Sequence, residues 1–445
     1  MDRSLIPGLT AKKNGGSMRK KEKEMETITA KKTWEKRMAG IGAACFWAGL
    51  LLELLIVVVD ISAYINPIEG QLFRLTFLLF AVKVLCSRFS RREWLWLLFF
   101  GVLAGICYLC STRDEAVRLV VFCAAFRDVD VKKALKLSFF VTLAGCLVLT
   151  LLAALGLLGN MYIIDDGERG LRYTFGLGHP NAVYCLFWAL SALGIWLWHE
   201  KMKPVHYGLI ALAGLLLFIP TRSRTGVLFL IFTLALSLLL VYRRQAGERK
   251  LLYVFGIAAL FACVLLSVWI AYYEPYQGPF YTYIDRFITG RITSMNTLES
   301  GGGRLCNWSL FSSPENIKYF DLGYVRLFYW YGIIPGAAYV VMYALLLWEC
   351  RRRRDPYGFM MLLSFALYTM LEAHFVSVYM GRNYALFLMG AYWGGIVEKR
   401  DLPAGAGVQM GQEPSAGTTG GPEKLRRGYV WMLPGMLLGR GGEKG

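Results

Sequence analysis

Two arginines two positions apart, Arg222 and Arg224, lie in the stretch TRSRTG at 221–226. A guanidinium group carries a fixed charge and a planar fork that binds two phosphate oxygens at once. Ser223 and Thr225 can cap a helix that begins here, and the N-terminus of a helix also attracts anions. The stretch therefore predicts a phosphate-binding site.

A second motif, GLGHPN at 176–181, places an imidazole at the start of an apolar segment. Pro180 suits the first turn of a helix, because its missing N–H costs no hydrogen bond there. The glycines permit close approach of a chain or a ligand. A single histidine is more often structural, but its place in this turn makes His179 a candidate general base or acceptor-positioning residue, with Asn181 beside it.

A carboxylate lies near the end of the apolar segment 358–378. A carboxylate at the centre of a membrane helix costs roughly 2.5–3.5 kcal/mol, and less near its end. Ionisable groups in such segments usually face the bundle interior or a wet cavity. Glu372, with His374 two residues later, is therefore a second candidate base. Glu53 is isolated in the sequence and is assigned no role.

The composition indicates an integral membrane protein. Hydrophobic residues make up 56% of the 445 residues and charged residues 18%, against roughly 25% charged in ordinary globular proteins. The 10 cysteines show no metal-ligand spacing and are expected to act as small core residues. No metal and no cofactor are expected.

Apolar segments predict an all-α polytopic membrane bundle of about twelve transmembrane helices. A bilayer core of ~30 Å needs about 20 apolar residues per helix, and backbone polar groups in hydrocarbon must be satisfied within the segment. The segments are 38–60, 71–87, 94–112, 115–127, 134–158, 181–198, 205–220, 225–242, 251–273, 324–348, 358–378 and 383–397.

The distribution of positive charge predicts the orientation. With twelve spans, 35 of the 49 lysines and arginines fall on the side of the N-terminus, which the positive-inside rule makes cytoplasmic. We therefore expect a plasma-membrane protein with both termini in the cytoplasm: a basic segment 1–37, a membrane domain 38–398 and a Gly-rich, disordered tail 399–445. The net charge of +18 reflects topology, and no nucleic-acid partner is expected.

Two predicted outer loops are long, 159–180 and the fifty-residue loop 274–323 between spans nine and ten. Loops of this length are usually functional or disordered, so the second is either a partly ordered cap or a floppy surface loop. Arg172 and Arg291 lie in these loops, where the positive-inside rule disfavours arginine. An anionic partner follows, either lipid headgroups or a lipid-linked pyrophosphate.

Over residues 38–398 the chain resembles the bacterial O-antigen ligase and Wzy-type polysaccharide polymerase family. GLGHPN, SRTG, DRFITGR (285–291) and DLGYVRLFYWYGIIPG (321–336) occur in the order found in that family. The resemblance is strongest to the capsule and exopolysaccharide polymerases of Gram-positive bacteria. The family often has Asp-Asn-Gly-Tyr where this chain has Leu322 in second place, while Asp321 and Tyr324 match.

The resemblance implies a metal-independent membrane glycosyltransferase of the GT-C type, with an extracytoplasmic active face. Such an enzyme moves a glycan from an undecaprenyl-pyrophosphate carrier onto a sugar hydroxyl of the next lipid-linked repeat unit, with inversion. The lipid-linked oligosaccharide, the bilayer, a flippase and a chain-length regulator are the expected partners.

The residues divide into three expected roles. Arginines stabilise charge on the departing pyrophosphate, and a base deprotonates the acceptor hydroxyl. The pyrophosphate ligands are Arg172, Arg222, Arg224 and Arg291; the candidate bases are His179 and Glu372; and Asn181, Asp321 and Tyr324 shape the site.

Three other functions remain open from the sequence. A ligase would use the same carrier with a different acceptor. A flippase or transporter would also need outer arginines, but transporters commonly contain paired repeats, and the sequence shows no internal repeat. A non-catalytic membrane scaffold is the third.

Overall fold

The computed structural model describes residues 12–165, 170–272, 279–288, 290–297, 302–373, 376–398 and 429–430. The described chain is all-α apart from two short antiparallel ladders. Its α-helices are α1 (Lys12–Ile61), α2 (Glu69–Leu85), α3 (Arg91–Ser111), α4 (Glu115–Ala125), α5 (Val131–Ala154), α6 (Pro180–Trp198), α7 (Pro204–Thr221), α8 (Arg224–Tyr242), α9 (Lys250–Tyr272), α10 (Pro279–Phe287), α11 (Arg291–Thr297), α12 (Gly323–Tyr331), α13 (Ile333–Arg352), α14 (Pro356–Thr369) and α15 (Tyr384–Glu398).

Eight helices in the described chain are long and apolar enough to cross a membrane: α1, α3, α5, α6, α7, α8, α9 and α13. The protein is thus a membrane-embedded helical bundle, as its sequence predicts. The apolar helices α2, α4, α14 and α15 are shorter, with 17, 11, 14 and 15 residues. At about 1.5 Å per residue, α4 is only about 17 Å long, so twelve full spans remain a prediction.

The predicted span 324–348 is two helices in the structure. The chain breaks at Gly332, which has φ +96° and separates α12 from α13. A Cβ at this position would lie 2.6 Å from the carbonyl oxygen of Leu310. The close approach of the loop around residue 310 therefore requires a glycine and breaks the helix there.

The predicted span 358–378 is also shorter than expected. Helix α14 ends at Thr369, residues 370–373 and 376–379 are not helical, and the 3₁₀ turn η4 (Met380–Arg382) precedes α15. Glu372 consequently lies in a non-helical segment and not in the last turns of a span.

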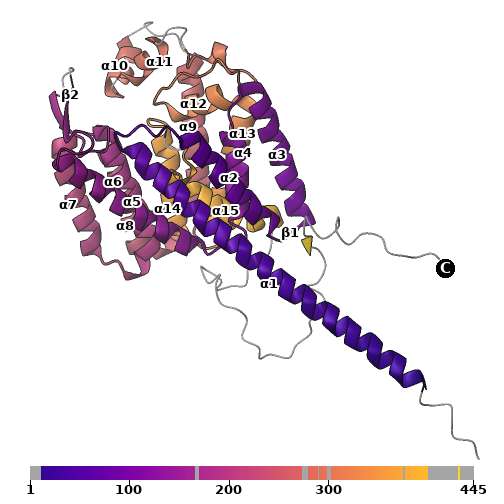
Figure 1. Ribbon diagram of the computed structural model, residues 1–445. Helices are drawn as coiled ribbons and strands as arrows, with labels where there is room; N and C mark the ends of the chain where they lie inside the picture. Colours follow the sequence, from indigo (N-terminus) through magenta and orange to yellow (C-terminus); the bar gives the residue numbers. More distant parts are fainter. Residues whose placement is uncertain are drawn as a thin grey trace, which may run out of the picture.

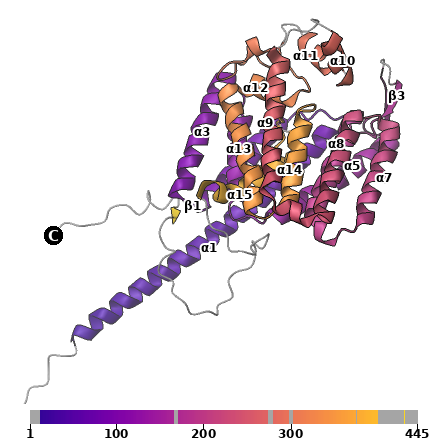
Figure 2. The ribbon, with the colours of Figure 1, turned by 180° about the vertical axis from the view of Figure 1, so that it is seen from behind.

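The two predicted outer loops contribute to the same end of the bundle. Figures 1 and 2 show α10, α11 and α12 there, together with the hairpin of β2 (Tyr162–Asp165) and β3 (Gly170–Tyr173). We call this the loop end. The first part of α1 extends from the opposite end, so the predicted segment 1–37 is helical from Lys12 onward.

Away from the loop end, strand β1 (Phe89–Ser90) pairs with β4 (Tyr429–Val430). Apart from β4, the predicted tail 399–445 lies outside the described residues.

In the bundle core α6 packs on α14, where the rings of Trp188 and Tyr368 stack with centroids 4.3 Å apart. The Trp188 indole N–H donates to the hydroxyl of Thr233 on α8 at 2.9 Å. These contacts fix α6, α8 and α14 relative to one another.

Candidate functional site

Arg172 joins three segments at the loop end. It lies on β3, and its side chain is only 1% exposed. Its Nε donates to the carbonyl oxygen of Thr221 at 2.9 Å, and its Nη2 donates to Oδ1 of Asn181 at 2.9 Å. The sequence places Arg172 and Asn181 in one site, and the structure brings them together. The guanidinium thereby holds the hairpin against the end of α7 and the start of α6.

The TRSRTG stretch forms the turn between α7 and α8. Arg222 adopts the left-handed conformation with φ +50°, and its N–H donates to the carbonyl of Phe218 at 2.7 Å. An L-residue with a side chain rarely adopts this conformation, and such residues cluster at functional sites. Arg222 also reaches the hairpin, because a Cβ on Gly170 would lie 4.0 Å from its Nη1. Arg224 is the first residue of α8.

The side chains of this turn alternate between solvent and interior. Those of Arg222 and Arg224 are exposed, whereas Ser223 between them is buried. Ser223 occupies the N-cap position of α8, but its side chain makes no capping hydrogen bond. The expectation that its hydroxyl caps the helix is therefore wrong. The two exposed arginines thus flank Ser223, the N-cap of α8, and the N-terminus of a helix favours an anion.

His179 is the N-cap residue of α6. Its Nδ1 accepts a hydrogen bond from the backbone N–H of Asn181 at 3.2 Å, with Pro180 in the first turn as predicted. The imidazole is exposed. Gly176 has φ +77°, and a Cβ there would lie 2.6 Å from the side chain of Ala153. The predicted close approach at this glycine is confirmed, and it is an approach of chain to chain.

A second group of polar residues surrounds Arg291, the first residue of α11. Its guanidinium forms a short ion pair with Glu372, lies 3.6 Å from Oδ2 of Asp321 through Nε, and donates to the carbonyl of Ile288 at 2.9 Å. We call Arg291, Glu372 and Asp321 the carboxylate cluster. Asp285 caps α11, because its Oδ1 accepts from the N–H of Ile292 at 2.8 Å. The DRFITGR motif thus sets Arg291 in place through its own first residue.

Burial raises the pKa of Glu372 to about 7, and the adjacent Arg291 guanidinium opposes this rise. The charge of Asp321 adds to the rise, because a second negative charge nearby disfavours ionisation. Glu372 lies beyond the end of α14 at the loop end, with its side chain 18% exposed. A carboxyl group with this pKa accepts a proton from a substrate near neutral pH.

Tyr324 is placed differently from its neighbours in the motif. Its ring is buried, and its hydroxyl donates to the carbonyl of Ala366 on α14 at 2.9 Å. Asp321, three residues earlier, is half-exposed and belongs to the carboxylate cluster. Tyr324 therefore contributes to the site by packing α12 against α14.

Helix α6 packs against α7, α8 and α14. Asn181 is in its first turn, and Cys185, four residues later, interacts electrostatically with both Glu372 and Arg382. The thiol of Cys185 also forms a hydrogen bond with the hydroxyl of Tyr368 on α14. The hairpin beside the arginine turn and the helix α11 of the carboxylate cluster both lie at the loop end (Figures 1 and 2).

Several charged residues at this end were not predicted as site residues. Arg382 pairs with Asp60, and the hydroxyl of Tyr379 donates to Oε1 of Glu69 at 2.8 Å. Glu53 is not isolated: it accepts a hydrogen bond from the N–H of Met380 at 2.9 Å and faces Arg118 at 3.8 Å. The sequence did contain a signal for Glu53: a single charged residue in an apolar segment needs a partner inside the bundle.

Arg326 is a further charged residue that was not predicted as a site residue. It is 2% exposed, and its Nη2 donates to the carbonyl oxygens of Ala373 at 2.9 Å and Val376 at 2.5 Å. His374, the histidine predicted beside Glu372, lies outside the described residues.

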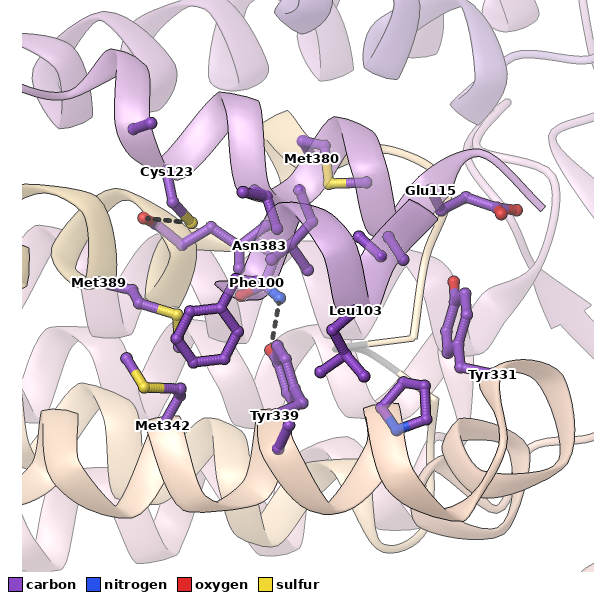
Figure 3. A pocket seen from close by; sticks show the side chains of 18 of the residues that line it. Phe100, Leu103, Glu115, Cys123, Tyr331, Tyr339, Met342, Met380, Asn383 and Met389 are labelled. Atoms are coloured by element: carbon purple, nitrogen blue, oxygen red, sulfur yellow. Dashed lines mark hydrogen bonds between the residues drawn. The ribbon is translucent and has the colours of Figure 1, made fainter. Parts of the chain in front are cut away.

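An apolar pocket of about 110 Å³ lies beside the site, between α3, α4, α13 and α15. Figure 3 shows Glu115 and Tyr331 at one end of it and Met342 and Met389 towards the other. Asn383 donates to the hydroxyl of Tyr339 at 3.3 Å on its wall. The residues that line the pocket include none of the predicted site residues, so this pocket is separate from the arginine turn and the carboxylate cluster.

No protein-family model, no curated protein and no solved structure matches the chain. Among the described residues, no group of three or more His, Cys, Asp or Glu side chains is arranged to hold a metal ion. The arrangement offers exposed guanidinium groups for an anion and a partly buried carboxyl group, with its pKa raised to about 7, for a proton.

Proposed function

We propose that the protein is a membrane glycosyltransferase that transfers a glycan from a polyprenyl diphosphate carrier to a sugar hydroxyl of another lipid-linked repeat unit. The observation that carries this proposal is the pairing, on one end of a membrane bundle, of the exposed Arg222–Arg224 turn with Glu372. The order of the motifs resembles that of the polysaccharide polymerase family and supports the same reaction. Polymerisation of a capsular polysaccharide or exopolysaccharide on the outer leaflet follows.

Arg222 and Arg224 bind the diphosphate in this mechanism. Both are exposed and flank the N-cap residue of α8, where the helix amides also favour an anion. As the glycosidic C–O bond breaks, its electron pair leaves with the diphosphate, and the two fixed cations stabilise the added charge. Arg172 and Asn181 hold the hairpin and α6 around this turn.

Glu372 acts as the general base. The acceptor hydroxyl oxygen forms the new bond to the anomeric carbon as its proton moves to the carboxylate, and attack opposite the departing diphosphate inverts the configuration. Arg291 holds the carboxylate through their ion pair, so its role is orientation of the base and not the diphosphate contact expected from the sequence. Asp321 shares the same guanidinium.

His179 has a supporting place in this scheme. Its Nδ1 is engaged with the N–H of Asn181, which fixes the exposed imidazole at the start of α6. Asn181, its hydrogen-bond partner, also accepts from Arg172, which contacts Thr221 beside the arginine turn. We therefore assign it to positioning the acceptor sugar.

Purified protein in nanodiscs with undecaprenyl diphosphate-linked repeat units tests the proposal. A ladder of polymer should form without added metal, and Glu372→Gln should abolish it while single repeat units remain. A protein that moves repeat units across vesicles without lengthening them would instead be a flippase. Transfer of one glycan onto an unrelated acceptor, with no ladder, would identify a ligase.

A further inference from the structure

Arg326 is a buried cation that the proposed reaction leaves without a role. It lies on α12, and its guanidinium carbon is 4.0 Å from the ring centroid of Tyr319 and 4.6 Å from that of Trp330. Within the described chain, its Nε and Nη1 have no hydrogen-bond partner. Burying a charged group costs free energy unless the group is paired or hydrogen-bonded. The burial of Arg326 therefore has to be offset by other contacts.

The hydrogen bonds of Nη2 provide these contacts. This nitrogen donates to the carbonyl oxygens of Ala373 and Val376, and Ala373 directly follows Glu372. Because α14 ends at Thr369, these carbonyls lie beyond the helix and lack its regular hydrogen bonds. A backbone carbonyl that is buried without a hydrogen-bond donor costs free energy. Arg326 provides that donor for the segment bearing the base.

The first residue of α12 brings it close enough for this contact. A Cβ on Gly323 would lie 2.3 Å from the carbonyl oxygen of Thr369 and 3.0 Å from the Cα of Ala373. Helix α12 therefore packs backbone to backbone against the segment that begins at Thr369. Arg326, one turn further along α12, contacts the same segment from the side.

We propose that Arg326 is a positioning residue that fixes the segment 370–373 and thereby holds Glu372 against Arg291. The assignment of Glu372 as a base rests on the proposed function, whereas the hold on the segment does not. The positive charge of Arg326 also lowers the pKa of Glu372, by less than Arg291 does. Arg326 therefore acts on Glu372 in two ways: it donates hydrogen bonds to the backbone beside Glu372, and its charge lowers the pKa of Glu372.

Arg113 offers a matched control at the same end of the bundle. Its guanidinium carbon lies 4.2 Å from the centroid of the same Trp330 ring, and its Nη2 donates to the carbonyl of Asn316 at 3.1 Å. Like Arg326, Arg113 is an arginine that contacts Trp330 and donates to a backbone carbonyl. Unlike that of Arg326, its carbonyl acceptor lies outside the segment that contains Glu372. Loss of Arg113 tests for general damage to the loop end.

The experiment compares Arg326→Met, Arg326→Lys and Arg113→Met in nanodiscs. Hydrogen exchange should accelerate at least about tenfold at residues 370–373 in Arg326→Met and remain unchanged there in Arg113→Met. Polymer formation should fall by about 10²-fold in kcat, the typical cost of a 1 Å misplacement, with little change in KM for the lipid-linked donor. The acid limb of the pH profile should move to higher pH, because removing a cation raises the pKa of Glu372.

Arg326→Lys keeps the charge but has no planar fork, so it should retain the pH midpoint while still loosening the segment. This variant carries the test if Arg326→Met does not fold. Unchanged exchange at 370–373 in both Arg326 variants would overturn the inference, whatever the activity. Full polymer formation by Glu372→Gln would overturn the proposed role of Glu372 and leave the exchange result for Arg326 standing.

Discussion

Nη2 of Arg172 donates a hydrogen bond to Oδ1 of Asn181 at 2.9 Å, which joins the β2–β3 hairpin to the first turn of α6. The same guanidinium donates to the carbonyl of Thr221 through Nε, so one buried cation aligns two predicted motifs, GLGHPN and TRSRTG. The geometry of the arginine turn therefore depends on Arg172, whose own side chain is buried.

Arg172→Ala should destabilise the protein and abolish polymer formation. Each hydrogen bond to a charged group contributes roughly 1.5–3 kcal/mol, and the variant leaves both acceptors without this donor. We expect a lower Tm in detergent together with loss of product. Asn181→Asp keeps an acceptor and should be tolerated, whereas Asn181→Leu should lose stability. Equal Tm values for Arg172→Ala and the native protein would argue against this alignment.

Arg222→Ala and Arg224→Ala should weaken binding of undecaprenyl diphosphate. A charge-assisted hydrogen bond is worth roughly 1.5–3 kcal/mol, and each 1.4 kcal/mol is about a tenfold change in Kd, so each variant should bind about 10- to 100-fold less tightly. The Tm should change little, because both side chains are exposed.

Arg243→Ala provides the control for charge alone. Arg243 is an exposed arginine at the other end of α8, after Tyr242. Isothermal titration in nanodiscs should give the native Kd for this variant. If all three variants bind alike, the arginine turn is not the diphosphate site.

The rate of polymer formation should depend on the ionisation of Glu372. The base works as a carboxylate, so the rate should be constant well above pH 7 and fall about tenfold per unit below the pKa, which is raised to about 7. Asp321→Asn removes a negative charge that raises this pKa, so the midpoint should move to lower pH. Initial rates from about pH 5 to 9 measure both effects, and a midpoint that ignores Asp321 would contradict the coupling.

The sequence predicts the helices well and the site only in part. Apolar run length is a local property, so the helical bundle and the starts of α6 and α8 could be recognised from Pro180 and the TRSRTG stretch. The ends of the spans near residues 332 and 369 could not, because they depend on distant partners: the loop at Leu310 approaches Gly332, and α12 contacts the chain after Thr369.

A single sequence also does not show which charged residues form ion pairs with each other. Arg291 and Glu372 are 81 positions apart, and the sequence, which grouped Arg291 with the phosphate ligands, did not predict their ion pair. Arg326 was recognisable only as a cation near the end of a predicted span, since spacing alone does not show which carbonyls lack a donor. The motifs therefore indicate which residues lie at the loop end but not which of them contact one another.

Gly332→Ala should be among the most destabilising small substitutions in the bundle. Its φ of +96° is unfavourable for any residue with a Cβ, and that atom would lie 2.6 Å from both the carbonyl oxygen of Leu310 and the Cα of Phe311. Strain at such a position costs of order 1–3 kcal/mol before the clash is counted. We expect a clearly lower Tm and a shifted loop end with reduced polymer formation.

Gly101→Ala is the matched substitution for this test. Gly101 lies inside α3, and a Cβ added there would have nothing within 4 Å. Alanine is favoured over glycine in a helix interior by about 1 kcal/mol, so this variant should be neutral or slightly more stable than the native protein. A Gly332→Ala protein as stable as Gly101→Ala would show that the break between α12 and α13 is not enforced by the contact with residues 310–311.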